Sequence, residues 1–116
     1  MPKGQALPCV EQSCCTLTTG VPTHPEAERL AAIFKALGDP TRVKLVSLIA
    51  VSEEHEACIC ELVKAVGLAQ STVSHHMRQL ADTGLVQREQ RGKWAYYRLN
   101  IPLLQEIGET LNPQAN

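Results

Sequence analysis

Hydrophobic positions along the chain repeat at helical spacing between short polar or glycine-containing breaks. The first repeat lies between Pro25, a favoured first residue of a helix, and Gly38, which stands where helices commonly end. Asp39 and Pro40 then provide a capping side chain and a first residue for a second helix. The side chains expected to face the core are Leu30, Ile33, Phe34 and Leu37 in the first helix and Val43, Leu45, Val46, Leu48 and Ile49 in the second.

Two short helices are predicted after an acidic loop over residues 53–56. The first of them ends at Gly67. The second begins at Gln70 or Ser71, and Gly84 terminates it. Two helices joined by a short turn that contains glycine form a helix-turn-helix. Their expected buried side chains are Ile59, Leu62, Val63 and Val66, followed by Val73, Met77 and Leu80.

The periodicity changes after Gly84. Residues 85–88 and 94–99, rich in Val, Trp and Tyr, predict two strands joined by a polar turn over residues 90–93. A hairpin directly behind a helix-turn-helix is a wing. A last amphipathic helix is predicted from about Pro102, with Leu103, Leu104, Ile107 and Leu111 on its apolar face.

These elements predict a mainly α fold with a small β-hairpin wing, a winged helix-turn-helix. The length of 116 residues suits a single domain. We divide the chain into a flexible, cysteine-containing arm over residues 1–24 and a DNA-binding and dimerisation domain over residues 25–112. The first and last helices carry more apolar surface than a lone small domain can cover, so we expect a homodimer through those two helices.

Composition excludes several functional classes. No apolar run approaches about 18 residues and no secretion signal is visible, so we expect a cytoplasmic protein without a membrane partner. Aromatic residues make up 3% of the chain, which argues against a platform for stacked single-stranded bases. The motifs that thiol oxidoreductases or phosphate-binding enzymes need are missing, and we expect no enzyme activity.

Positive charge is concentrated in one part of a chain whose net charge is −1. Residues 70–98 hold five cationic and two acidic side chains, which gives that segment +3 and leaves −4 for the rest. A locally basic half fits a directed contact with phosphate. Charge alone would fit a solvated face equally well.

Four segments carry specific motifs: ALGDPTRVKLV (36–46), EACICEL (56–62), QSTVSHHMRQLADTGLV (70–86) and GKWAYYRLN (92–100). Together they resemble the ArsR/SmtB family of metal-responsive winged-helix repressors. The first segment resembles the family's entry segment, and the second resembles its ELCVCDL metal-box motif. The third is similar to its recognition helix, and the fourth to its wing. The resemblance covers roughly residues 26–111. It implies a dimer that represses an operator and releases it on binding a toxic metal or metalloid ion.

A recognition helix exposes short polar side chains to base edges near its N-terminal end. The candidates are Gln70, Ser71, Thr72, Ser74 and His75. Gln can bond adenine, and Ser and Thr suit several bases, although both are also ordinary residues at a helix start. His76 and Arg78 are better placed for phosphate or for a partner's surface. In the wing, Arg88, Arg91 and Lys93 are expected to contact phosphate, which fixes register without reading sequence.

Five cysteines are many for a reducing compartment, where they favour metal or redox chemistry over structural disulfides. They are Cys9, Cys14 and Cys15 in the arm, and Cys58 and Cys60 at the start of the helix-turn-helix. The field of a helix N-terminus is expected to favour the thiolates of that last pair. Positions i and i+2 of a helix point to nearly opposite faces. Cys58 and Cys60 can therefore share an ion only if Cys58 is not yet helical; otherwise one binds and the other packs.

Cys14 and Cys15 are adjacent and can turn to one ion. The ten residues that follow Cys15, up to the first predicted helix, span at most about 33–36 Å, so the arm can reach a partner subunit. With Cys58 or Cys60 the pair supplies three thiolates, which matches the pyramidal coordination of As(III). A fourth, from the remaining cysteine of the metal box or from Cys9, suits Cd(II), Pb(II) or Zn(II).

The family resemblance offers both kinds of ion. Some arsenic repressors resemble CCTLTTG (14–20), an N-terminal vicinal pair followed by a TLxTG-like sequence, whereas cadmium and lead repressors share N-terminal cysteines plus the metal-box pair. We expect As(III) or Sb(III) as the inducer and no organic cofactor, with Cd(II), Pb(II) or Zn(II), or a thiol-redox signal, as the alternatives. The last helix has no His for the zinc site that the family places there. The expected ligands are Cys14, Cys15, Cys58 and Cys60.

Overall fold

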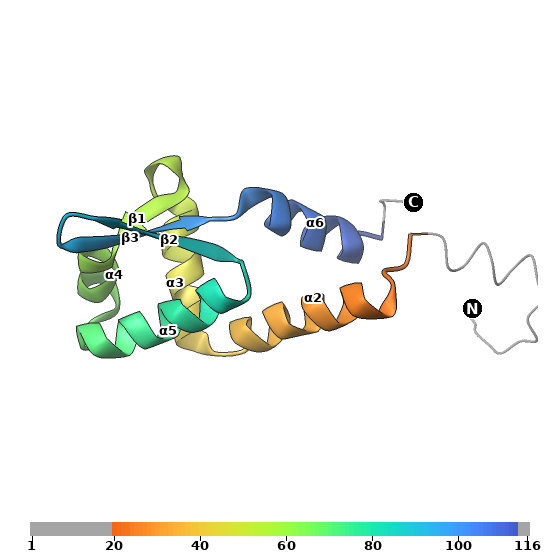
Figure 1. Ribbon diagram of the computed structural model, residues 1–116, viewed down its shortest axis with the longest axis horizontal. Helices are drawn as coiled ribbons and strands as arrows, with labels where there is room; N and C mark the ends of the chain where they lie inside the picture. The colour runs from red at the N-terminus through yellow and green to blue at the C-terminus, as the bar shows by residue number, and fades with distance from the viewer. Residues whose placement is uncertain (1–19, 114–116) are drawn as a thin grey trace, which may run out of the picture.

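The computed structural model describes residues 20–113, which fold around one apolar core (Figure 1). The predicted arm lies largely outside this range. No helix in the described part is long and apolar enough to cross a membrane. The elements are α2 (His24–Leu37), α3 (Pro40–Val51), the 3₁₀ turn η1 (Glu53–His55), β1 (Glu56–Cys58), α4 (Ile59–Val66), α5 (Gln70–Asp82), β2 (Val86–Arg91), β3 (Trp94–Leu99) and α6 (Ile101–Leu111).

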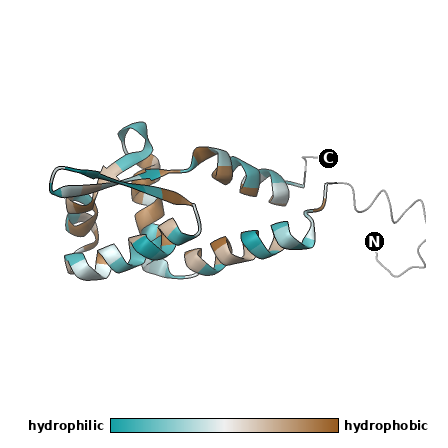
Figure 2. Cartoon of the chain, in the orientation of Figure 1, coloured by the Kyte–Doolittle hydropathy of each residue, from teal (hydrophilic) through white to brown (hydrophobic). Residues whose placement is uncertain are grey.

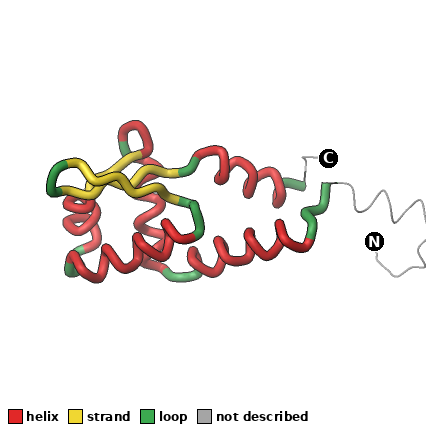
Figure 3. The backbone as a smooth tube through the Cα atoms, viewed as in Figure 1, coloured by secondary structure: helices red, strands yellow, loops and turns green. Residues whose placement is uncertain are grey.

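The helices α3, α4 and α5 form a body with the sheet, whereas α2 and α6 extend together away from it (Figure 3). An ion pair between Arg29 and Glu106, with an N–O distance of 2.6 Å, joins α2 to α6. The order helix, helix, helix-turn-helix, wing, helix confirms the predicted winged helix-turn-helix fold.

The sheet has three antiparallel strands in the order β1-β3-β2. The hairpin pairs Val86 with Leu99 at its base and Arg91 with Trp94 at its tip. Gly92 makes the turn in a left-handed conformation, with φ 63°. The predicted hairpin is therefore present, but its first strand runs on to Arg91, past the predicted end at residue 88.

The strand β1 replaces the end of the predicted acidic loop. Glu53–His55 forms the turn η1, and Glu56 begins the strand. In the register of β1 with β3, Glu56 lies opposite Arg98, and Cys58 lies opposite Tyr96. A strand of three residues is too short to show an alternating pattern, so it could not be recognised from the sequence.

Capping side chains begin four of the described helices. The helix α5 differs, because it follows Ala69 and no side chain there accepts a hydrogen bond from its first turn. The predicted cap of α3 by Asp39 is confirmed, with a hydrogen bond of 3.1 Å from the backbone N–H of Arg42. The four capping residues are Thr23 for α2, Asp39 for α3, Cys58 for α4 and Asn100 for α6.

The core fixes one face of α5 against the body. Val73, Met77 and Leu80 are fully buried, as predicted from their spacing. They belong to one cluster with Leu45 and Ile49 of α3. The other side of α5 faces outward, and Figure 2 shows mostly hydrophilic colours along this helix and β2.

Three apolar side chains that the periodicity assigns to the core are exposed. Val43 is 49% exposed, Phe34 40% and Leu111 63%. The helix α3 has apolar residues on all sides, so its repeat does not single out the buried face. Phe34 and Leu111 belong to α2 and α6, the two helices that extend from the body.

Replacing Leu45 with alanine is expected to lower the free energy of unfolding by about 2–5 kcal/mol, because this fully buried side chain would leave a cavity. Val43→Ala, on the same helix, is expected to change it by less than about 0.5 kcal/mol. Denaturant titration followed by circular dichroism, at one protein concentration, measures both variants. Equal losses would contradict the exposure of Val43.

Candidate nucleic-acid interface and thiol pair

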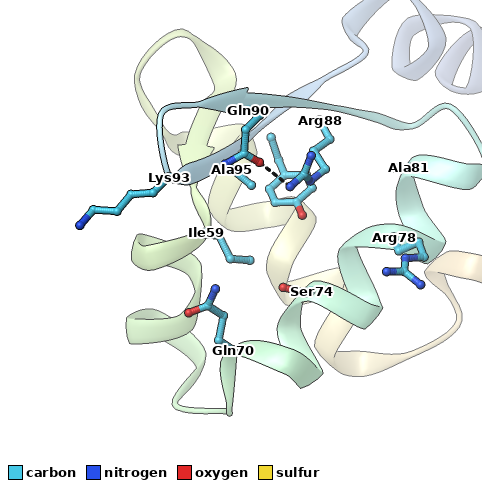
Figure 4. A pocket seen from close by; sticks show the side chains of 10 residues that line it. Ile59, Gln70, Ser74, Arg78, Ala81, Arg88, Gln90, Lys93 and Ala95 are labelled. Atoms are coloured by element: carbon cyan, nitrogen blue, oxygen red, sulfur yellow. Dashed lines mark hydrogen bonds between the residues drawn. The ribbon is translucent and has the colours of Figure 1, made fainter.

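A hollow of about 490 Å³ lies between α5 and the hairpin (Figure 4). One wall is a single side of α5, where Gln70, Ser74 and Arg78 follow one another at intervals of four residues. The other wall is the face of the hairpin that is turned toward α5. The lining residues are Ile59, Gln70, Ser74, Arg78, Ala81, Arg88, Gln90, Lys93, Ala95 and Tyr97, and we call this surface the basic hollow.

Three cations line the basic hollow, and no carboxylate does. Arg88 donates a hydrogen bond of 2.6 Å to Gln90, which itself donates to the carbonyl of Gly92 at 3.0 Å. Within the described residues, neither Arg88 nor Arg78 nor Lys93 forms an ion pair with a carboxylate. Positive charge without a carboxylate partner is the chemistry that binds a phosphate backbone.

The other charges of the hairpin neutralise one another on the opposite face of the sheet. Glu56 accepts two hydrogen bonds of 2.7 Å from Arg91 and one of 2.8 Å from Arg98. Arg91 also donates to Glu89 at 2.8 Å, and its Cζ lies 4.3 Å from the centre of the Tyr96 ring. We call Glu56, Glu89, Arg91 and Arg98 the outer ion-pair cluster.

Hydrogen bonds from Arg91, and then from Arg98, lower the pKa of Glu56 to about 2. The same Arg91 lowers the pKa of Glu89, and the two carboxylates raise the pKa of Arg91. The cluster therefore stays ionised at neutral pH. The sequence predicts a phosphate contact for Arg91, but in this structure it is paired with carboxylates, so phosphate would have to compete with Glu56.

The other residues that are predicted to contact base edges lie on α5, outside the basic hollow. Ser71, Thr72 and His75 are exposed on α5. His76 turns instead toward α3, where its Nδ1 lies 3.2 Å from the guanidinium of Arg42. The structure thus brings Gln70, Ser74, Arg78, Arg88 and Lys93 together in one surface.

Sequence patterns do not reveal three of the residues that shape these surfaces. They place Glu56 in an acidic loop and Gln90 in a turn, and they indicate no role for Arg42. Glu56 and Arg42 act on partners far away in sequence, and Glu56 lies 35 residues from Arg91. Gln90 acts locally, on Arg88 and Gly92, each two residues away. The role of Glu56 could have been predicted only if the pairing of its strand with the wing had been predicted.

Cys58 and Cys60 stand where β1 passes into α4. Cys58 has extended backbone, with φ −76° and ψ 147°, and its Sγ accepts a hydrogen bond of 3.3 Å from the N–H of Cys60. Glu61 completes a capping box by accepting from the N–H of Cys58 at 2.8 Å. Cys58 is thus not helical, which meets the condition under which both thiols can turn to one ion.

The Cys58 side chain is buried, whereas that of Cys60 is exposed. A hydrogen bond with the Cys58 thiol raises the pKa of Cys60, so the expected lowering by the helix N-terminus does not hold for Cys60. Within residues 20–113, no three His, Cys, Asp or Glu side chains gather as a metal site. Cys9, Cys14 and Cys15 lie outside the described residues.

Several known proteins are similar to this chain in sequence or in fold. The family described as "Bacterial regulatory protein, arsR family" matches residues 39–88, from the end of the α2–α3 connection into β2. The arsenic resistance transcriptional regulator ArsR1 of Pseudomonas putida is 43% identical over 79 residues, which cover 68% of this chain and 60% of that protein. The arsenical resistance operon repressor of Staphylococcus xylosus is 34% identical over 85 residues, which cover 73% of this chain and 79% of the repressor.

Among solved structures, the AntR antimony-specific transcriptional repressor resembles this chain with a TM-score of 0.62 and 29% identity. The match covers 73% of this chain and 76% of AntR. This family and this fold are those of transcriptional regulators, which confirms that the chain is not an enzyme.

The low pKa of Glu56 makes part of the stability depend on pH. Its pKa is about 2 in the folded chain against 4.5 for the free group, so its ion pairs stabilise the fold fully above about pH 5. That contribution is lost as the pH falls from about 4.5 toward 2. The unfolding free energies of the wild type and Glu56→Gln should differ by a constant amount above about pH 5 and converge below it. A difference that stays constant to about pH 2.5 would contradict an ionised Glu56.

Proposed function

Because this chain belongs to the ArsR family of bacterial regulatory proteins, we propose that it represses transcription as a metal-free homodimer on operator DNA and is released by As(III) or Sb(III). The observation that carries the proposal is the basic hollow beside the recognition helix, one residue away from both metal-box cysteines through Ile59. The relatives named for arsenic resistance and the antimony-specific AntR support this choice of ion. The protein acts in the cytoplasm, where its DNA partner and reduced thiols are found.

On the DNA side, α5 enters the major groove with Gln70, Ser71, Thr72, Ser74 and His75 near its N-terminal end. The basic hollow receives the sugar-phosphate backbone beside that groove. Arg78 from α5 and Arg88 and Lys93 from the wing contact phosphate. Arg91 contributes to this contact only when it exchanges Glu56 for phosphate.

The dimer forms through α2 and α6. Both helices extend from the body, and both leave large apolar side chains exposed, with Phe34 on α2 and Leu111 on α6. A second copy that covers these faces by twofold symmetry removes that surface from water. The two recognition helices are then placed about one DNA turn apart.

On the ion side, Cys58 and Cys60 provide two thiolates from each chain. Soft thiolates favour As(III) and Sb(III), and a third thiolate completes the pyramidal coordination that these ions prefer. Since no third ligand gathers with them among residues 20–113, we assign the third thiolate to either Cys14 or Cys15, in the arm of the same or the partner chain.

Binding of the ion by cysteines of the arm and of the metal box explains how the DNA is released. An ion that ties the arm to Cys58 and Cys60 pulls on the start of α4, which packs against α5 through the buried core. The recognition helices then no longer match two successive turns of the major groove. By thermodynamic reciprocity, operator DNA weakens ion binding by the same factor, with typical couplings of about 1–3 kcal/mol.

Two other inducers are compatible with the cysteines. Four thiolates, from both pairs, suit Cd(II), Pb(II) or Zn(II). A disulfide between an arm cysteine and Cys60, whose thiol is exposed, would respond to an oxidant without any metal. Ultraviolet thiolate charge-transfer titration separates three from four thiols per ion, and release by peroxide alone identifies the redox sensor.

Arg88→Ala and Lys93→Ala should weaken binding to operator and to unrelated DNA by similar factors, because each variant removes a cation that binds phosphate. The slope of log affinity against log salt should fall by roughly one for each of these cations. Fluorescence anisotropy at several salt concentrations measures both. As a matched control, Arg91→Ala should have a smaller effect, because Glu56 already holds this side chain. A larger loss for Arg91→Ala than for Arg88→Ala would overturn this division of roles.

Arsenite should release the wild type from its operator but leave the Cys14→Ser/Cys15→Ser variant bound. Cys58→Ser should also resist release, while its hydroxyl can still cap α4 and so preserve the fold. Cys9→Ser should behave as the wild type. Anisotropy of labelled operator during arsenite titration measures all of these. Normal release of the double variant would remove the arm from the sensor.

A further inference from the structure

The outer ion-pair cluster connects the strand that leads into the metal-box cysteines to the wing. Glu56 lies two residues before Cys58 on β1, and its side chain is 17% exposed. Its carboxylate binds Arg98 on the middle strand β3 and Arg91 on the far strand β2. One side chain therefore ties all three strands together.

The bond between Glu56 and Arg91 is a direct tie from β1 to the wing's first strand. In the order β1-β3-β2, the backbone of β1 pairs with β3, so β1 reaches β2 through side chains. Arg91 packs over Tyr96, and Tyr96 is the register partner of Cys58. Arg91, which Glu56 holds, therefore lies over the ring of the residue that pairs with Cys58 in the sheet.

Arg91 is also well placed to move the tip of the wing. It is the last residue of β2, directly before the turn at Gly92, and Lys93 of the basic hollow follows that turn. A displacement of β1 that carries Glu56 along would pull on Arg91 and so change where Lys93 points. None of the DNA contacts assigned above is made by Glu56, whose carboxylate instead competes with phosphate for Arg91.

We propose that Glu56 is a positioning residue that transmits ion binding at Cys58 and Cys60 to the wing through Arg91. The inference rests on the proposed function. It names the route by which ion binding changes the contact between the wing and DNA. Without Glu56, the ion still binds and the wing no longer responds.

The test compares Glu56→Gln with Glu89→Gln in the full chain. Glutamine keeps the shape of the side chain and removes the charge that holds both arginines. Glu89 is the matched control, because it pairs with Arg91 at 2.8 Å and with Arg98 at 3.7 Å but lies on the wing itself. Operator affinity is measured with and without arsenite, and arsenite binding is followed by its thiolate charge-transfer band.

In the wild type and in Glu89→Gln, arsenite should weaken operator binding by a factor typical of allosteric coupling, about 5- to 150-fold. In Glu56→Gln the charge-transfer titration should stay near that of the wild type. The metal-free affinity should not fall and should rise if Arg91, freed from the carboxylate, binds phosphate. The ratio of affinities without and with arsenite should fall toward one. A merely structural role would lower all three quantities together.

A second readout needs no DNA. Trp94 is the only tryptophan of the chain, is 42% exposed, and lies opposite Arg91 in the hairpin register. Arsenite should shift its fluorescence in the wild type and in Glu89→Gln, but not in Glu56→Gln. If Glu56→Gln proves unfolded by circular dichroism, Arg91→Lys decides, because a lysine keeps the charge and cannot bind a carboxylate in the bidentate manner. It should show the same loss of coupling and of the fluorescence shift.

The outcomes separate the inference from the function. A wild type that arsenite fails to release overturns the proposed function. A wild type that is released, together with an equally responsive Glu56→Gln, overturns the inference alone. Loss of the charge-transfer band in Glu56→Gln also overturns it, because Glu56 would then act on ion binding and not on transmission.

Discussion

The pairing of β1 with β3 is the contact on which the rest of the arrangement depends. It involves only the three residues Glu56–Cys58, yet it brings the entry of α4 against the wing, about 40 residues further along the chain. Because Cys58 ends this strand, its backbone is extended and its thiol caps α4. Because Glu56 begins the strand, its carboxylate reaches the two arginines of the hairpin. The pairing of β1 with β3 therefore determines both the position of the Cys58 thiol and the ion pairs of the wing arginines.

The same pairing distributes charge between the two faces of the sheet. Arg91 and Arg98 are neutralised on the outer face by Glu56 and Glu89. Arg78, Arg88 and Lys93 are left to line the basic hollow, where carboxylates are absent from the lining. A chain with a net charge of −1 therefore presents a positive surface at one place, which neither its overall charge nor the +3 of residues 70–98 would locate.

Local chemistry explains why much of the fold could be predicted. Helix boundaries follow from residues that act on their own neighbours, such as Asp39 at the start of α3 and Gly67, whose φ of 72° ends α4. The buried stripe of α5 follows from spacing alone. Most of the wrong predictions depend on nonlocal contacts, although the raised pKa of Cys60 has a local cause, its hydrogen bond with Cys58. The exposure of Val43 depends on which side of an all-apolar helix meets the core, and the partner of Arg91 depends on a strand too short to detect.

For the site, five of the residues that the sequence predicts to contact DNA line the hollow, but the sequence does not indicate how the charges of the wing are divided. Gln70, Ser74 and Arg78 follow from the helical repeat, so their shared face was foreseeable. That Arg88 and Arg91 point to opposite faces depends on the detailed register of a hairpin, and a one-residue change in that register would exchange them.

The missing cap of α5 has a consequence for how this protein can be stabilised. Ala69→Ser or Ala69→Asp would give the first turn an acceptor and typically adds about 1 kcal/mol to helix stability. Aspartate would also set an anion at the residue before Gln70, at the mouth of a surface whose cations have no carboxylate partner. The bare start of α5 keeps the positive end of the helix dipole open to a phosphate chain. An aspartate at position 69 would therefore gain stability at the expense of affinity for a polyanion, whereas a serine would add the cap without the negative charge.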